Sequence, residues 1–388
     1  MKNRWPLIWL LVAGLFASLG MPRDGRAQAV ATPLFLNALN FPGRDIGEKI
    51  NNAFASLPIH TFPAACGQVR VPPGNYKFNT TIQIPTDLFA GTPNCQLIGS
   101  GSSVTVLKYT GNGDAINAVM IGPAGTFPFM AGMIADLDIE GNPAAVSGIH
   151  FGNSVGQVIE DVEVGYFTGS SGTGIWVDNA GSYTEQWKLS RVTVTYNTYG
   201  VRFSQEPGAS ASFEHGFADV NCQLGSVPGQ TCIYVEGGAD LSRGVLQLNG
   251  DVSNGTLVHV DGSSRVGLAG PESFFLGAEN SSPTQNTTIR FQVDSGGYIE
   301  LIGVIWGMGS GAHDVINGTF RFAGFDHSTD MFSVPAATVF GSSLPGPILT
   351  LRNPNGDFLD LVDASGKVVA YFDSSGTLHA NVVPPPQH

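Results

Sequence analysis

Four acidic side chains and one arginine have the types and spacing that acid–base or metal chemistry requires. Asp136 and Asp138 lie two residues apart in a short run of alternating apolar and polar residues, and Asp161 and Glu163 repeat this spacing in the next run. Arg191 occupies the matching position in a third run. Carboxylates gathered in a small patch bind a cation, raise one carboxyl pKa or pair with a base. These residues are therefore the first candidates for a site.

The runs that carry these residues are predicted to be β-strands with one buried face, because their apolar residues alternate with polar ones. They span Ile134–Glu140, Val158–Val164, Leu189–Thr195 and Phe217–Cys222. The equivalent positions, Asp136, Asp161, Arg191 and Asp219, recur about every 25 to 30 residues without a helical pattern between them. This period predicts a parallel β-helix in which Leu137, Val162, Val192 and Val220 stack inside. A sandwich or barrel would join its strands in hairpins and would not require such recurrence.

The first 29 residues are predicted to be a secretory signal peptide. Lys2 and Arg4 precede the apolar run Leu7–Leu19, and Ala27 and Ala29 provide the small residues of a cleavage site. The run is too short for a permanent membrane span. We therefore expect a secreted protein, whether extracellular, periplasmic or on the cell surface.

The net charge of the chain restricts the class of ligand that we expect it to bind. The chain of 388 residues has a net charge of −13, and cleavage of the predicted leader would remove more basic residues than acidic ones. An acidic protein of this kind is not expected to bind nucleic acid. An acidic polysaccharide would need a local basic strip or a bridging Ca²⁺, whereas a neutral glycan meets no such obstacle.

Four cysteines in an exported chain predict structural disulfides, because none of them has the Cys-x-x-Cys spacing of a metal site. Three pairings are open. The local choices are Cys66 with Cys95 and Cys222 with Cys232, each of which would join neighbouring coils or close a loop.

Other segments organise the ends of the solenoid. Residues 30–62 are predicted to form an arm and a capping helix over 44–57, which Asp45 and Glu48 begin as a capping box. The β-helix is expected over 63–333, and the proline-containing stretch 334–347 is predicted to be a linker. Glycines 356, 366 and 376 mark a small β-meander over 348–381, with a disordered tail at 382–388. This meander predicts either a terminal cap or a homo-oligomer, such as a trimer.

Residues 41–120 resemble a known family. The order is an amphipathic helix, then Gly67-Gln-Val-Arg-Val-Pro-Pro-Gly-Asn-Tyr76, Thr81-Ile-Gln-Ile84 and Leu97-Ile-Gly-Ser-Gly101. It is similar to the amino-terminal part of the pectate-lyase-like superfamily, in the branch related to family 28 glycosidases and phage tailspikes. The resemblance implies a right-handed parallel β-helix that cleaves or binds polysaccharide.

The chemistry of the candidate residues gives them expected roles in two kinds of reaction. A lyase would use Ca²⁺ held by Asp136, Asp138, Asp161 and Glu163 while a nearby base removed a proton from a uronate, and a glycosidase would need only two of the carboxyl groups. The candidate catalytic residues are Asp161, Arg191, Asp136, Lys188 and His215. Aromatic rings that could stack on sugars are Trp176, Trp187, Tyr196 and Tyr199.

The alternative interpretation is a non-catalytic, glycan-binding or surface-structural β-helix. The chain lacks the Asp-Asp, Gly-His-Gly and Arg-x-Lys motifs of polygalacturonase-type members and has only Glu214-His-Gly216 near one of them. Acidic residues ahead of apolar ones also commonly satisfy backbone amides at coil corners. Both interpretations predict the same fold.

Overall fold

The chain divides into two units, residues 1–333 and 334–388, and each is described by itself. The computed structural model describes residues 35–57, 66–86, 95–119, 129–130, 132–224, 229–252, 255–268, 275–278, 289–305, 313–326, 331–333, 359–362, 368–372 and 378–380. The predicted signal peptide, linker and carboxy-terminal tail lie outside these residues. No helix among them is both long and apolar enough to cross a membrane.

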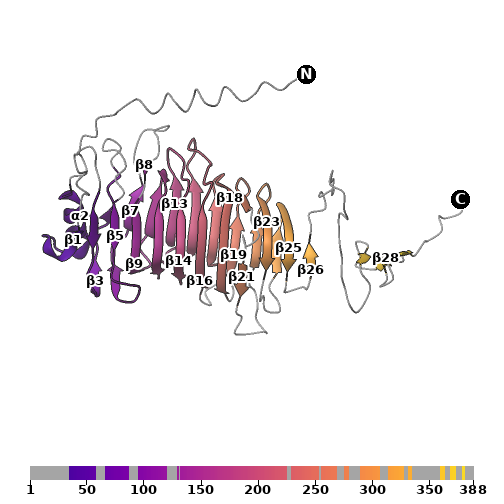
Figure 1. Cartoon of the computed structure of the whole chain (residues 1–388), viewed down its shortest axis with the longest axis horizontal. Coiled ribbons are helices and arrows are strands. Elements are labelled where there is room, and N and C mark those ends of the chain that lie inside the picture. Colours follow the sequence, from indigo (N-terminus) through magenta and orange to yellow (C-terminus); the bar gives the residue numbers. More distant parts are fainter. Residues whose placement is uncertain are drawn as a thin grey trace, which may run out of the picture. The chain divides into compact units, whose positions relative to one another are not determined.

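The first unit is built from two long sheets, between which the chain alternates (Figure 1). Sheet A comprises β1 Phe35–Asn37, β2 Gln68–Arg70, β3 Gly74–Phe78, β5 Gln96–Ile98, β6 Thr105–Tyr109, β9 Met133–Glu140, β12 Val158–Gly165, β14 Lys188–Thr195, β16 Phe217–Leu224, β18 Asp240–Val252, β20 Arg265–Leu268, β21 Phe275–Ala278, β23 Tyr298–Ile305, β25 Thr319–Asp326 and β26 Met331–Ser333. Sheet B comprises β4 Ile82–Gln83, β7 Asp114–Val119, β10 Ser147–Gly152, β13 Thr173–Asn179, β15 Tyr199–Gln205, β17 Thr231–Glu236, β19 Thr256–Val260, β22 Ile289–Val293 and β24 His313–Ile316. Two short strands, β8 Phe129–Met130 and β11 Ser154–Val155, pair separately.

Neighbouring strands within each sheet come from successive coils and run parallel, except for the β25–β26 pair. Consecutive parallel pairs such as β9–β12, β12–β14 and β14–β16 are the defining pattern of a parallel β-helix. The predicted fold class is therefore confirmed.

The core is a stack of apolar side chains inside the coils. Val162 pairs with Leu137, and Val192 pairs with Val220. All four side chains are buried, as the repeat predicted. Burial of each such side chain contributes roughly 1.5 to 3 kcal/mol, so the inward column is what holds successive coils together.

Buried and outward-facing residues do not alternate strictly along the strands, contrary to the prediction from the sequence pattern. Ile134 and Leu137 are both buried although they lie three residues apart. The backbone accommodates this because Asp136 adopts a left-handed conformation, with φ of 58°. Asp161 and Arg191 do the same on the next two coils, with φ of 53° and 52°. One residue in this conformation turns the side chains that follow it back into register with the core.

A helix, α2 (Ile46–Ala55), precedes the first coils and follows the 3-10 turn η1 (Ala38–Asn40). The Asp45 side chain accepts a hydrogen bond from the Glu48 amide at 2.9 Å, which is the N-cap expected from the sequence. Glu48 reaches back one residue further than predicted and accepts from the Arg44 amide at 2.6 Å. Asp45 also accepts from the amides of Asn79 and Thr80, which ties the helix to the first coils.

Both local disulfides are present. Cys66 pairs with Cys95, 29 residues away, and Cys222 pairs with Cys232, 10 residues away. The first joins the segments that lead into β2 and β5, which are neighbours in sheet A. The second links β16 of sheet A to β17 of sheet B.

The second unit contains a three-stranded antiparallel sheet formed by β27 (Leu359–Val362), β28 (Val368–Phe372) and β29 (Leu378–Ala380). β27 and β28 fall between the glycines at 356, 366 and 376 that marked the predicted meander, and β29 follows the last of them. Trimerisation through residues 348–388 stays a prediction.

Removal of the Cys66–Cys95 disulfide by a double Cys→Ser substitution should cost more stability than removal of Cys222–Cys232. The chain-entropy relation gives about 3.6 kcal/mol for the longer loop and about 2.8 kcal/mol for the shorter. Urea titration of the oxidised chain would measure both free energies of unfolding. An equal or larger loss for the Cys222–Cys232 variant would contradict the loop-length account.

Candidate functional site

The outward side of β9, β12 and β14 brings the sequence-predicted acids together. Glu163 lies opposite Asp138 in the strand register, and Thr193 and Asn221 continue that column. Asp136, Asp161 and Arg191 fall between matched pairs of the same strands and form a second column, as predicted. We call this surface the acidic face and define it by Asp136, Asp138, Glu140, Glu160, Asp161, Glu163 and Arg191.

Arg191 is held by two carboxylates of the preceding coil. Its Nε and Nη2 atoms each donate to Asp161 at 2.6 Å, and Nη2 also donates to Glu160 at 2.9 Å. These hydrogen bonds lower the pKa of Asp161 and raise the pKa of Arg191. Because a guanidinium does not give up its proton in a protein, Arg191 can orient or neutralise an anion but cannot act as a base. The Arg191 side chain is 56% exposed, so the ion pair adds little to stability.

Glu163 and Asp138 form a carboxyl pair on adjacent strands with unequal surroundings. Burial raises the pKa of Glu163, and the nearby charges of Asp138 and Glu140 raise it further, against a weaker opposing hydrogen bond from Thr195. Asp138 is nearly buried and accepts from Ser102 Oγ at 2.6 Å and from the Ser103 amide at 2.8 Å. A carboxyl group with a raised pKa therefore lies opposite a carboxyl group that two hydrogen bonds hold in one orientation. Such unequal pairs perform acid–base catalysis in many enzymes.

Two exposed tyrosines follow the same strands. Tyr166 comes directly after β12 and is 48% exposed, while Tyr196 comes directly after β14 and is 42% exposed. Their ring centroids are 5.6 Å apart and the rings are tilted by 33°. Both have left-handed backbones, with φ of 69° and 53°. Two large rings thus lie exposed at successive coil corners, in a conformation that is costly for tyrosine.

The structure places three of the aromatic residues predicted to contact sugar away from the exposed surface of the acidic face. Trp187 is only 4% exposed, and its Nε1 atom donates to the carbonyl of Phe213 inside the coil. Trp176 and Tyr199 lie on sheet B, and Trp176 has His150 against one side of its ring and Arg202 against another. Their surfaces are therefore already covered or point away from the acidic face. Tyr196 is the predicted aromatic residue that remains.

The remaining predicted catalytic residues lie at the opposite end of the strands from the carboxyl pair. Lys188 begins β14, where its Nζ atom is 3.9 Å from Glu160. His215 lies in the corner before β16, with φ of 58°, and is 3.7 Å from Glu214. Because Thr193 is the β14 residue opposite Glu163, five residues separate it from Lys188, or roughly 16 Å of strand.

The acidic face has some of the oxygen ligands that Ca²⁺ prefers, but Asp138, Asp161 and Glu163 already accept hydrogen bonds from other side chains. Within the described ranges, no group of three His, Cys, Asp or Glu residues is arranged to hold a metal ion. The proposed ligands Asp138 and Asp161 instead accept hydrogen bonds from Ser102 and Arg191. Calcium binding stays a prediction.

Several residues were missed by reasoning from the sequence. Tyr166 was recoverable, because it stands two residues after Val164 as Tyr196 stands two after Val194. A second signal was the repeat Gly-apolar-x-apolar, whose third positions are His150, Trp176 and Arg202. The strand register places these three side by side on sheet B, so His150, which the sequence left isolated, has charged and aromatic neighbours.

A chain whose parallel strands alternate between two stacked sheets is a parallel β-helix protein. The sequence matches no family model and no curated protein. Among solved structures it is similar to ORF18 of Geobacillus virus E2, with 14% identity, a TM-score of 0.40, and coverage of 76% of this chain and 62% of that one. This chain therefore spans less than two thirds of the phage protein.

Two enzymes are also similar in structure. For carrot pectin methylesterase the identity is 11%, the TM-score 0.39, and the coverage 78% of this chain and 91% of that one. For the A-module of the mannuronan C-5 epimerase AlgE6 from Azotobacter vinelandii the identity is 17% and the TM-score 0.33, and the match covers 75% of this chain and 99% of that one. Because these identities and TM-scores are low, the fold is assigned from the chain's own strand pairing, and the candidate site is assigned from its own residues.

The left-handed backbone at Arg191 predicts an unusual response to glycine. Arg191→Gly should be more stable than Arg191→Ala by about 0.5 to 1 kcal/mol, because both lose the ion pair but only alanine keeps the backbone cost. At Thr193, in regular strand two residues away, the order should reverse. Free energies of unfolding of the four variants measure the effect, and a less stable glycine variant at position 191 would contradict the assigned backbone.

Proposed function

We propose that the protein is an exported, polysaccharide-active β-helix that hydrolyses an extracellular glycan at the acidic face. The observation that carries the proposal is the Glu163–Asp138 pair, in which the group with the raised pKa lies directly opposite a fixed carboxylate. Hydrolysis of a glycosidic bond needs these two roles, a proton donor and a carboxylate.

The pair suits a retaining reaction. Adjacent coils lie roughly 4.8 Å apart, close to the separation of about 5 to 5.5 Å at which a carboxylate can attack directly. Glu163 would donate its proton to the glycosidic oxygen as the C–O bond breaks, while Asp138 bonds to the anomeric carbon. Water would then release the sugar from Asp138 as Glu163 takes up the water's proton. Atoms and charges balance over the two steps.

Hydrolysis fits the face better than elimination. A lyase needs a base beside a uronate and a cation that neutralises the carboxylate. Arg191 remains protonated and is already paired with Asp161 and Glu160. The other acids would repel an anionic chain. A neutral polysaccharide is therefore the proposed substrate class, with the exposed rings of Tyr166 and Tyr196 as its stacking surface.

The second candidate function is glycan binding without catalysis. One specific observation favours it: Asp138 also anchors the turn at Ser102 and Ser103, where Ser103 has a φ of 62°. A carboxylate that holds a turn can be retained for structure alone. In that case the acidic face and its tyrosines would recognise a glycan and leave it intact.

Glu163→Gln should abolish most of the turnover. Loss of a general acid costs about 10²- to 10⁴-fold in kcat. The assay is incubation of the mature chain with neutral and uronate glycans, with and without chelator, with detection of reducing ends and unsaturated products. Asp219→Asn, on the same sheet two coils further along, is the matched control and should retain activity.

The outcomes of that assay separate the alternatives. Reducing ends without unsaturated products support hydrolysis, and unsaturated products that disappear with chelator support the lyase with calcium. Binding without turnover on any glycan supports the second candidate. Activity that survives both Glu163→Gln and Asp138→Asn would overturn the assigned site.

Tyr196→Ala should weaken glycan binding by about tenfold, because a stacked ring contributes on the order of 1 kcal/mol beyond its buried area. Tyr196→Phe keeps the ring and should bind nearly as well as the unaltered chain. Tyr166→Ala and Tyr166→Phe test the partner ring in the same way. Isothermal titration with neutral oligosaccharides measures the four affinities, and equal affinities for the alanine and phenylalanine variants would remove the stacking role.

A further inference from the structure

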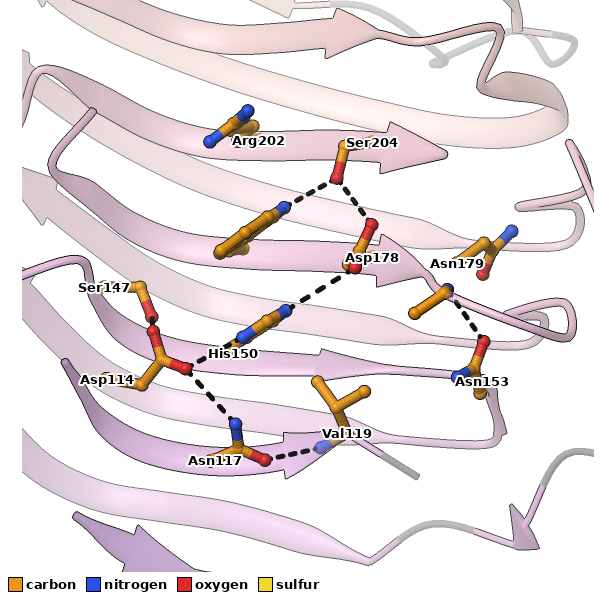
Figure 2. A network of polar contacts seen from close by, with 12 residues as sticks. Asp114, Asn117, Val119, Ser147, His150, Asn153, Asp178, Asn179, Arg202 and Ser204 are labelled. Atoms are coloured by element: carbon orange, nitrogen blue, oxygen red, sulfur yellow. Dashed lines mark hydrogen bonds and ion pairs between the residues drawn. The ribbon is translucent and has the colours of Figure 1, made fainter. Parts of the chain in front are cut away.

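His150 lies at the centre of a polar network on sheet B (Figure 2). Its Nδ1 atom is 2.9 Å from Asp114 Oδ2 on β7, and its Nε2 atom faces Asp178 Oδ2 on β13 at 3.9 Å. The residue is only 9% exposed. Within the described part of the chain, Nε2 has no hydrogen-bond partner. One buried ring thus lies between carboxylates from the coil before it and the coil after it.

This geometry selects the protonated ring. A carboxylate only accepts hydrogen bonds, whereas a neutral imidazole carries one N–H and one lone pair. With a proton on Nδ1 alone, the lone pair of Nε2 would point at Asp178. The second proton converts that repulsion into attraction, so the imidazolium matches both neighbours.

The surrounding side chains hold the two carboxylates in place. Asp114 accepts from Ser147 Oγ at 2.7 Å and from Asn117 Nδ2 at 3.2 Å. Asp178 accepts from Ser204 Oγ at 2.7 Å, which in turn accepts from Trp176 Nε1 at 2.6 Å. Figure 2 shows this chain of contacts running across neighbouring strands of sheet B. The network therefore cannot easily rearrange to suit a neutral ring.

The charged groups around the ring can be counted strand by strand. Asp114 comes from β7, Asp178 from β13, Arg202 from β15 and Glu236 from β17, where Glu236 pairs with Arg202. Trp176 is stacked on the His150 ring at 4.0 Å and has the Arg202 guanidinium 4.8 Å from its centroid. These groups carry three negative charges and one positive charge. A positive charge on His150 therefore halves the net negative charge that remains. The indole face also favours a cation.

We propose that His150 is a pH-dependent lock that fastens three successive coils through β7, β10 and β13 while its ring is charged. When the ring loses its proton, the β10 rung keeps its backbone ladder but loses the side-chain attraction to Asp178. The lock is independent of the glycan site, which lies on sheet A.

The direction of the pH effect follows from the neighbours. Burial by itself lowers the pKa of His150, but the hydrogen bond and charge of Asp114 together with the influence of Asp178 outweigh it, so the pKa is raised. The stabilisation is therefore fully present below the unfolded value of about 6.5 and is lost as the pH rises through the folded value. Asp114 has a lowered pKa, so its own contribution is lost only in acid, outside this window.

Two measurements on the mature full-length chain test the lock. NMR titration of ¹³C-labelled histidine rings should place the His150 midpoint above that of a histidine in an unfolded peptide. Hydrogen exchange, corrected for the intrinsic pH effect, should show protection of β7, β10 and β13 falling by about tenfold for each unit by which the pKa is raised. His150→Gln should remove this pH dependence.

His259→Gln is the matched control, because His259 occupies the same column of sheet B but pairs with one carboxylate, Asp294 at 3.0 Å. The control should keep the pH dependence of β7, β10 and β13. A His150 midpoint at or below that of the unfolded peptide, or an unchanged pH dependence in His150→Gln, would overturn the proposal.

If His150→Gln does not fold, Asp178→Asn decides the question. It leaves the ring and Asp114 in place but removes the second carboxylate, so the His150 midpoint should fall. An unchanged midpoint in that variant would overturn the proposal.

Discussion

Parallel pairing between successive coils is the constraint on which the rest of the molecule depends. Each residue of one coil is fixed opposite one residue of the next, as Val162 is opposite Leu137 and Glu163 is opposite Asp138. Inside the solenoid this arrangement stacks apolar side chains on one another and supplies the core. Outside, the same register stacks polar side chains roughly 4.8 Å apart, whether or not their charges agree. The function of either sheet therefore depends on what the register places side by side.

The outward faces of sheets A and B differ in how their charged side chains are paired across the coils. On sheet A, Arg191 follows Asp161 in its column, so opposite charges pair across the coils. In the neighbouring column, Glu163 lies opposite Asp138, and burial together with the charge of Asp138 raises the pKa of Glu163. On sheet B, the column His150, Trp176, Arg202 alternates cations with an aromatic ring, while carboxylates flank it. Two carboxyl groups of adjacent coils thus meet at the Glu163–Asp138 pair, which is what marks it as a candidate for catalysis.

Left-handed backbone recurs in two columns along sheet A. Asp136, Asp161 and Arg191 share one left-handed column, and Tyr166 and Tyr196 share another just beyond the strands. Aspartate tolerates this conformation better than arginine or tyrosine does. The first column is explained by the core, because it returns the following residues to the inside. The second explains how two large rings come to lie in solvent at successive corners.

Much of the fold could be predicted from the sequence because strand patterns, turn residues and nearby cysteines are local signals. The four organising strands and the inward stack from Leu137 to Val220 were of this kind. The two local disulfides were one of three pairings that the sequence left open, and the structure decides between them. The outward columns of acids could also be aligned, since each acid lies next to a core residue of its own strand. Local pattern could not decide that Trp187 fills the interior while Tyr166 and Tyr196 lie in solvent, because both outcomes suit an aromatic residue near a coil corner. Nor could it join His150 to Asp114 and Asp178. Those contacts cross two coils of unequal length, and only the three-dimensional register of the coils determines which distant residues meet.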